Sequence, residues 1–269
     1  MIGKILNNRY QITQVLGSGG FGETFLAEDT HIPGNPVCVV KHLKPLSNLP
    51  EQLAKAKELF DQEAKKLDQL GRHEQIPNLL AYFPEGDELF LVQQYIAGNT
   101  LDEELQPGQV WSEQQVIQLL LDLLPVLDFI HKAGTIHRDI KPPNIIRRDQ
   151  DNKLVLIDFG AVKDVQLKVG QTVHPTLATG TVIGTRGYMS SEQGQGKPRP
   201  SSDLYALGII CIQALTGKMP NQLEDDIDTG EIVWKHLVQA SPELKQVLEK
   251  MTWYHFRERY QSAAETLQS

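Results

Sequence analysis

Short apolar runs separated by glycine and proline dominate the first 45 positions. The segments RYQITQVL, TFLAED and CVVKHL are rich in β-branched and other apolar residues, and the turn HIPGNP separates the last two. This composition is typical of strands. A further run, DELFLVQQYI, has the same character. The pattern predicts a small β-sheet in the N-terminal part of the chain.

Residues 51–70 follow a helical period instead. Apolar side chains recur at the spacing of one helix face: Leu53, Ala56, Phe60, Ala64, Leu67 and Leu70. Glu63 lies on this stripe, whereas Glu58 lies among polar residues. An inward carboxylate requires a cationic partner. The alternative is that Glu63 sits at the edge of the stripe and reaches solvent.

The C-terminal part is mainly helical in its pattern. Ser112 and Gln115 form a capping-box signature before an apolar run that ends at Ile130. Short strands are predicted around NIIR and KLVLID, and SSDLYALGIICIQALTG reads as a buried helix closed by Gly217. We therefore expect an α+β fold, with a β-rich part over residues 1–97 and a helical part over 98–269.

Composition narrows the classes of partner. The chain has 269 residues and a formal net charge of -8, so it lacks the basic excess that nucleic-acid binding normally needs. Cys38 and Cys211 lie in apolar runs without metal or redox spacing, as buried small hydrophobes do. The most apolar segment is interrupted by Asp122, Pro125 and Asp128. We expect a cytoplasmic protein with no nucleic-acid partner and no membrane contact within this segment.

A glycine-rich stretch lies between two predicted strands. In LGSGGFGETF, Gly17, Gly19 and Gly22 form a G-x-G-x-x-G pattern, which alone is weak because many glycine-rich hairpins only turn. Since it leads into a strand rather than a helix, it favours a flap over phosphates and not a dinucleotide fingerprint. Lys41 ends the run CVVK, and either Glu63 or a phosphate could pair with it. The alternative is a solvated strand end.

Two predicted loops contain the candidate catalytic and metal-binding residues. The stretch IHRDIKPPNII presents Asp139, Lys141 and Asn144, and VLIDFGAV follows with Asp158. Phosphoryl transfer requires Mg²⁺ held by carboxylate and amide oxygens, and an acid that positions the attacking hydroxyl. A lysine ammonium can neutralise charge on the transferring group. The residue types therefore indicate phosphoryl transfer.

Three motifs occur in order: H-R-D-I-K-P-P-N, D-F-G and G-T-R-G-Y-M-S-S-E-Q. Through these motifs the chain resembles the bacterial eukaryotic-like (Hanks-type) serine/threonine protein kinases from about Tyr10 to Gln268. Its N-terminal sequence is most similar to that of cyanobacterial members. The resemblance implies a bilobal protein-kinase-like fold with a small β-rich N-lobe containing one key helix and a larger helical C-lobe. It also implies ATP, Mg²⁺ or alternatively Mn²⁺, and protein substrates with serine or threonine.

The resemblance assigns roles by matching position. Asp139 would be the base or orienter for the substrate hydroxyl, with Lys141 beside it, and Asn144 and Asp158 would be metal ligands. Lys41, paired with Glu63, would hold the α- and β-phosphates. The remaining ATP-binding residues are Leu16, Gly17, Gly19, Gly22, Thr24, Val39, Gln93 as gatekeeper, Gln94, Ile96 and Ile146.

Other positions match structural features of the family. Asp203 would anchor the catalytic loop, and Glu192 and Arg259 would form a buried ion pair. A hydrophobic spine would contain Leu67, Tyr82, His137 and Phe159, so His137 would be structural. The chain departs from the family pattern at S-S-E in place of A-P-E, at Pro143, at Thr24 and at Gln93. These departures affect substrate docking and inhibitor fit rather than ATP chemistry.

The loop after D-F-G is polar and rich in threonine. We hypothesise autophosphorylation at Thr179 or Thr181, with Arg138 available to bind the phosphate and self-association as one route. The alternative is that these threonines only solvate the loop. Two other functions stay open: an ATP-binding pseudokinase or scaffold, and a small-molecule phosphotransferase. The complete set of site residues disfavours the first, and the docking-loop motif disfavours the second.

Overall fold

The computed structural model describes residues 1–19, 22–43, 50–86, 88–159 and 187–269. They fall into two compact units. The first contains Met1–Ala97 together with Phe159, and the second contains Gly98–Asp158 and the described residues after position 186.

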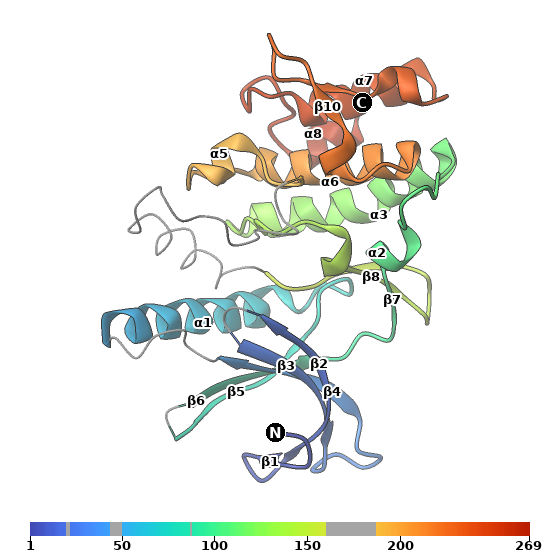
Figure 1. Ribbon diagram of the computed structural model, residues 1–269. Helices are drawn as coiled ribbons and strands as arrows, with labels where there is room; N and C mark the ends of the chain where they lie inside the picture. The colour runs from blue at the N-terminus through green and yellow to red at the C-terminus, as the bar shows by residue number, and fades with distance from the viewer. Residues whose placement is uncertain (20–21, 44–49, 87, 160–186) are drawn as a thin grey trace. The chain divides into compact units, whose positions relative to one another are not determined.

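A six-stranded antiparallel sheet forms the first unit (Figure 1). Its order is β1-β2-β3-β4-β6-β5. The strands are β1 Ile5–Leu6, β2 Tyr10–Gly19, β3 Gly22–Asp29, β4 Val37–Leu43, β5 Leu79–Glu85 and β6 Glu88–Gln94. The four strands expected from the sequence are confirmed, and β1 and β5 were not predicted.

Aromatic rings fill the core of this sheet. Tyr10 stacks on Phe83 with ring centroids 5.9 Å apart, and Phe83 stacks on Phe90 at 5.7 Å. Cys38 and Val40 complete the same buried cluster. Stacked rings at this separation stabilise a core beyond the area that they bury. The cluster includes Val40 of β4, so it also fixes the strand that carries Lys41.

Helix α1 extends from Pro50 to Leu70. Its predicted apolar stripe is buried at Phe60, Ala64, Leu67 and Leu70, while the side chains of Leu53 and Ala56 lie outside the described residues. Glu63 is 2% exposed and Glu58 is exposed. The prediction that Glu63 faces inward is therefore confirmed.

Helices dominate the second unit. They are α2 Leu101–Glu104, α3 Glu113–Lys132, α5 Ser191–Gly194, α6 Pro200–Thr216, α7 Pro242–Thr252 and α8 Ala263–Leu267. Helices α3 and α6 lie side by side (Figure 1), and α7 packs on α6. The absence of a side chain at Gly208 permits this approach, because a Cβ there would lie 2.7 Å from the Thr252 side chain.

Helix ends follow the sequence signals. Ser112 accepts a hydrogen bond from the backbone of Gln115, whose side chain accepts one from the Ser112 backbone, so the capping box is confirmed. Gly217 ends α6 with a φ of 65°, a left-handed conformation that glycine adopts without strain. Cys211 is fully buried in α6, as expected.

Short strands and turns complete the second unit. A three-stranded sheet has the order β7-β8-β9. Its strands and the remaining short elements are β7 Gly98–Thr100, β8 Ile145–Arg148, β9 Leu154–Leu156, β10 Glu224–Asp225, β11 Ile232–Val233, and the 3₁₀ turns η1 Pro142–Asn144, η3 Pro220–Gln222 and η4 Lys235–Leu237. The strands predicted around NIIR and KLVLID are confirmed as β8 and β9.

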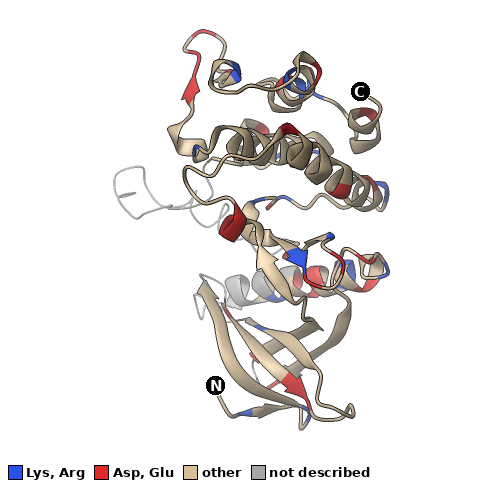
Figure 2. Ribbon diagram, turned by 90° about the vertical axis from the view of Figure 1, so that its right-hand side faces the viewer, with Lys and Arg blue, Asp and Glu red and all other residues tan. Residues whose placement is uncertain are grey.

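Along the ribbon of each unit, positions occupied by Lys or Arg are interspersed with positions occupied by Asp or Glu (Figure 2). Among the residues that the structure describes, no helix combines the length and apolar character needed to cross a membrane.

Candidate active site

A lysine and a glutamate meet in the first unit. Strand β4 places Lys41 and helix α1 places Glu63, with Nζ and Oε1 2.8 Å apart. The Glu63 side chain is 3% exposed and that of Lys41 is 17% exposed. The ammonium compensates a carboxylate that would otherwise be costly to bury, and it keeps partial access to solvent.

Three neighbouring strands align the glycine-rich segment with this pair. In the antiparallel register Gly17 is opposite Thr24, and Thr24 is opposite Lys41. Gly19 and Gly22 pair at the ends of β2 and β3, and residues 20–21 between them lie outside the described residues. A Cβ built at Gly17 meets nothing within 4 Å. The backbone there is open to a ligand, as polyphosphate binding through N–H groups requires.

The residues expected around adenine differ in exposure. Val39 is opposite Gln93 in the β4–β6 register, and both are buried, as is Ile96. Leu16 is 46% exposed. Ile146 belongs to the second unit, where β8 pairs it with Thr100 and Val155. The sheet thus brings Val39 and Gln93 together, and Leu16 presents an apolar side chain to solvent.

Gln93 and Gln94 use their polar groups differently. The Gln93 side chain is buried, and its Oε1 has no hydrogen-bond partner among the described residues. A buried acceptor in this state costs about 1–3 kcal/mol, so a ligand N–H would stabilise it. The Gln94 backbone N–H donates to the Asn78 carbonyl, and its side chain accepts from Asn78 Nδ2 at 3.0 Å. Asn78 therefore holds both the backbone N–H and the side chain of Gln94.

In the second unit, Asp203 holds the turn before Asp139. Its carboxylate accepts the backbone N–H groups of His137 and Arg138, both at 2.9 Å. A ring nitrogen of His131 lies 2.8 Å from the same carboxylate. Asp203 is 1% exposed at the start of α6. This buried carboxylate is satisfied by several donors and fixes the backbone that carries Asp139.

His137 is held as a neutral ring. Its Nε2 is 3.1 Å from the Ile157 carbonyl, and its Nδ1 accepts the Asp139 backbone N–H at 3.3 Å. The carbonyl can only accept, so Nε2 carries the proton and Nδ1 does not. Burial lowers the pKa of His137. The ring therefore has a structural part in the loop, and neither nitrogen is left to act as a base.

Asp139, Lys141 and Asn144 converge. Asn144 Nδ2 donates to the Asp139 carbonyl at 2.8 Å and to its carboxylate at 2.5 Å. Lys141 Nζ is 3.2 Å from the same carboxylate. Asp139 and Asn144 are 4% and 6% exposed. The turn η1 begins with Pro142 and Pro143, whose fixed φ favours this tight geometry.

The donor set fits a hard cation. Asn144 Nδ2 donates its hydrogen bonds to Asp139, so the amide oxygen of Asn144 is the atom that would bind a metal ion. Carboxylate and amide oxygens are the ligands that Mg²⁺ prefers. Asp158, the expected second ligand, has a φ of 63°, and Arg138 has a φ of 68°. Left-handed backbone at non-glycine residues is strained and persists where surrounding contacts hold it, typically at functional sites.

Glu192 and Arg259 form a second buried ion pair, as expected. Arg259 Nη1 lies 2.8 Å from Glu192 Oε1, and the hydroxyls of Ser190 and Ser202 donate to the same oxygen. Burial alone would raise the pKa of Glu192, but the Ser202 and Ser190 hydrogen bonds and the Arg259 charge hold that pKa below its usual range. Ser190, one of the departures from the family pattern, is thus a donor to the buried carboxylate.

Two contacts were not predicted. The Tyr82 hydroxyl donates to Asp61 of α1, and the Gln193 side chain donates to the Arg138 carbonyl at 2.6 Å. Burial, and then the Asp61 hydrogen bond, raise the pKa of Tyr82. Gln193 follows directly after S-S-E, and this position in the motif was the one sequence signal for a role near Asp139.

The proposed phosphorylation sites Thr179 and Thr181 lie outside the described residues.

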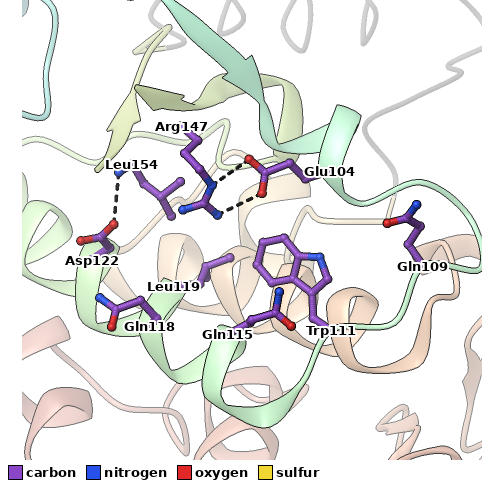
Figure 3. Close-up of a pocket in the computed structure, with 9 residues that line it drawn as sticks. All are labelled: Glu104, Gln109, Trp111, Gln115, Gln118, Leu119, Asp122, Arg147 and Leu154. Carbon is purple, nitrogen blue, oxygen red and sulfur yellow. Dashed lines mark hydrogen bonds and ion pairs between the residues drawn. The ribbon is translucent and has the colours of Figure 1, made fainter. Parts of the chain in front are cut away.

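A separate cavity of about 390 Å³ lies in the second unit between α2, α3 and the β8–β9 hairpin (Figure 3). Arg147 donates to Glu104 at 2.8 and 3.0 Å and lies over the Trp111 ring, and Asp122 accepts the Leu154 backbone N–H. None of the expected site residues lines it. Its ion pair is internal, so nothing connects this cavity to phosphoryl transfer.

Sequence comparisons agree with the motifs. Residues 10–269 match the protein kinase domain family. The chain is 50% identical to serine/threonine-protein kinase C of Synechocystis sp., in an alignment covering 98% of this chain and 50% of that protein. It is 46% identical to serine/threonine-protein kinase PknA of Nostoc sp., covering 99% and 47%. The chain spans about half the length of these curated relatives.

Solved structures show the same fold. The chain is similar to the Mycobacterium tuberculosis PknI kinase domain, with a TM-score of 0.73, 19% identity, and coverage of 100% of this chain and 97% of that one. It is also similar to a structure described as PpkA-294 apo form, with a TM-score of 0.75, 22% identity, and coverage of 100% and 98%. The expected bilobal α+β fold is confirmed.

Proposed function

Because this chain belongs to the protein kinase family, we propose that it is the catalytic domain of a serine/threonine protein kinase that transfers the γ-phosphoryl group of ATP to protein hydroxyls. The observation that carries the proposal is the Asp139 carboxylate with Asn144 Nδ2 at 2.5 Å and Lys141 Nζ at 3.2 Å, on a backbone that Asp203 holds. Acid, amide and ammonium are the groups that phosphoryl transfer requires.

The first unit would bind the nucleotide. Lys41, oriented by its ion pair with Glu63, would hold the α- and β-phosphates, and the backbone of Gly17, Gly19 and Gly22 would approach them. Within this unit, the purine would contact the side chains and backbone groups of Leu16, Thr24, Val39, Gln93, Gln94 and Ile96. The Oε1 of Gln93, which is buried and has no hydrogen-bond partner within the described part of the chain, supports a ligand donor at this position.

The second unit would supply the transfer chemistry. Asp139 would orient the substrate hydroxyl and accept its proton as the oxygen attacks the γ-phosphorus, and ADP would leave. Lys141, 3.2 Å from the Asp139 carboxylate, would stabilise the charge that develops on the transferring group. Asn144 and Asp158 would hold Mg²⁺, or alternatively Mn²⁺, which neutralises charge on the phosphates when bound.

Structural residues would keep this arrangement rigid. Asp203 would anchor the catalytic loop, and Glu192 and Arg259 would fix the segment that follows S-S-E. Arg138 would bind a phosphate on Thr179 or Thr181, and phosphorylation there would regulate activity. Transfer between two copies of the chain is one route to that modification.

The test is the intact mass of the protein, expressed with a phosphatase and then incubated with Mg²⁺ and ATP, together with phosphate transfer to casein as a serine- and threonine-containing substrate. Asp139→Asn keeps an acceptor for Asn144 but removes the carboxylate. We expect phosphate-sized mass additions and casein phosphorylation by the parent, and a loss of at least about 100-fold in the variant.

Asp228→Asn is the matched control, because this exposed aspartate lies in the β10–β11 hairpin. It should behave as the parent does. If the parent binds ATP but transfers phosphate neither to itself nor to casein, the proposed activity is wrong for this chain.

A further inference from the structure

Two consecutive peptide groups before Asp139 are fixed by side chains. The Arg138 backbone N–H donates to Asp203 Oδ1 at 2.9 Å, which fixes the peptide between residues 137 and 138. In the next peptide, the Arg138 carbonyl accepts from Gln193 Nε2 at 2.6 Å and the Asp139 N–H donates to His137 Nδ1 at 3.3 Å. The peptide that leads into Asp139 is therefore held on both edges.

The hydrogen bond to the Arg138 carbonyl, on one side of this peptide, comes from Gln193. A backbone carbonyl can only accept a hydrogen bond, so the group that Gln193 turns toward Arg138 is its amide NH₂. The side chain is buried, at 8% exposure, which strengthens the contact relative to one in water. Its neighbour Glu192 is fixed by Arg259, so the short helix α5 delivers the amide from an anchored position.

The backbone at this point needs such support. Arg138 has a φ of 68°, a conformation that only glycine adopts without penalty. A residue in this region persists when its surroundings hold it. Relaxation of Arg138 to a right-handed conformation would rotate the peptide that precedes Asp139 and turn the carboxylate away from Asn144 and Lys141.

We propose that Gln193 is a positioning residue for Asp139, which acts through its hydrogen bond to the Arg138 carbonyl and makes the geometry of the catalytic loop depend on the position of α5. This inference rests on the proposed kinase activity for its kinetic consequence. Its structural consequence, restraint of the 137–139 backbone, exists whether or not the protein transfers phosphate.

The test compares Gln193→Met with Gln195→Met. Methionine has a similar length and volume to glutamine but no N–H donor. Gln195 is exposed at the end of the same helix and serves as the matched control. For Gln193→Met we expect kcat for casein to fall about tenfold, as the loss of one buried hydrogen bond predicts, with the KM for ATP within about twofold of the parent.

Hydrogen exchange supplies a readout that does not need activity. In Gln193→Met, the amides of residues 137–139 should exchange about tenfold faster than in the parent, while the amides of α6 keep their parental rates. Gln195→Met should match the parent at both places. If the parent proves inactive, these rates still decide the positioning role.

A second test introduces Gln193→Met into two variants of Arg138. It distinguishes the effect of backbone strain at residue 138 from a general loss of stability. Arg138→Ala and Arg138→Gly both remove the guanidinium, but only glycine relieves the left-handed strain. Adding Gln193→Met should accelerate exchange about tenfold in the alanine background and less than about twofold in the glycine background. Equal acceleration in both, or a Gln193→Met variant that matches Gln195→Met in kcat and in exchange, would overturn the proposal.

Discussion

Each unit contains a buried ion pair, and the two differ in how completely they are enclosed. Lys41 and Glu63 of the first unit lie 2.8 Å apart, with side chains 17% and 3% exposed. Arg259 and Glu192 of the second unit lie at the same distance, with side chains 1% and 5% exposed. Both pairs are well formed, so distance alone does not distinguish them.

Hydrogen bonding distinguishes them. The Arg259 guanidinium donates to the Trp253 and Tyr254 carbonyls as well as to Glu192. Its planar fork matches several acceptors at once, which a lysine cannot do. Lys41 is a point charge on a flexible stem that retains access to solvent. The enclosed pair is suited to holding segments together, and the accessible pair is suited to receiving a phosphate.

The largest effect should come from breaking the enclosed pair. Arg259→Met leaves the Glu192 carboxylate buried without its cation and two carbonyls without their donor. We expect the free energy of unfolding to fall by about 3–5 kcal/mol. Urea denaturation followed by circular dichroism measures it.

The double variant Glu192→Gln with Arg259→Met separates the charge from the packing. Neutralising the carboxylate should recover part of the lost stability, because the unpaired buried charge is gone. A double variant as unstable as Arg259→Met would show that the ion pair itself contributes little.

The accessible pair should respond in activity instead. Lys41→Arg keeps a cation for Glu63 but replaces the compact ammonium with a planar guanidinium, which cannot present the same point charge to a phosphate. We expect kcat/KM to fall at least about 100-fold, equivalent to about 2.7 kcal/mol of transition-state stabilisation, with a change in unfolding free energy below about 1 kcal/mol.

Arg259→Lys is the reciprocal charge-conserving control. It should lower the unfolding free energy by about 1–3 kcal/mol through its unsatisfied acceptors, while kcat/KM of the folded protein changes less than about threefold. If both swaps alter activity equally, the contrast between the two pairs is wrong.

Part of this molecule could be read from its sequence. The period of residues 51–70 predicted that Glu63 faces inward, because a helix face repeats at a fixed spacing. The short stretch IHRDIKPPNII predicted that Asp139, Asn144 and Lys141 share one turn, and the structure brings them together. Local spacing was sufficient in both cases.

Contacts between distant positions could not be read in this way. Gln193 and Arg138 are 55 positions apart, and Tyr82 and Asp61 are 21 apart on different elements. Asp61 lies on the polar side of the helical pattern, where solvent would satisfy it. Only the packing of β5 against α1 gives that carboxylate a partner, and β5 itself was not predicted.

The smallest effect tests that last contact. Tyr82→Phe keeps the ring that lies 5.8 Å from Phe60 and removes only the hydroxyl that donates to Asp61. The unfolding free energy should fall by about 0.5–1.5 kcal/mol, the net value of one hydrogen bond. Because α1 also carries Glu63, looser attachment of the helix should lower kcat by less than about fivefold. Asp61→Asn retains an acceptor and should change both quantities less, whereas a Tyr82→Phe protein with parental stability would show that the hydroxyl does not fasten α1 to the sheet.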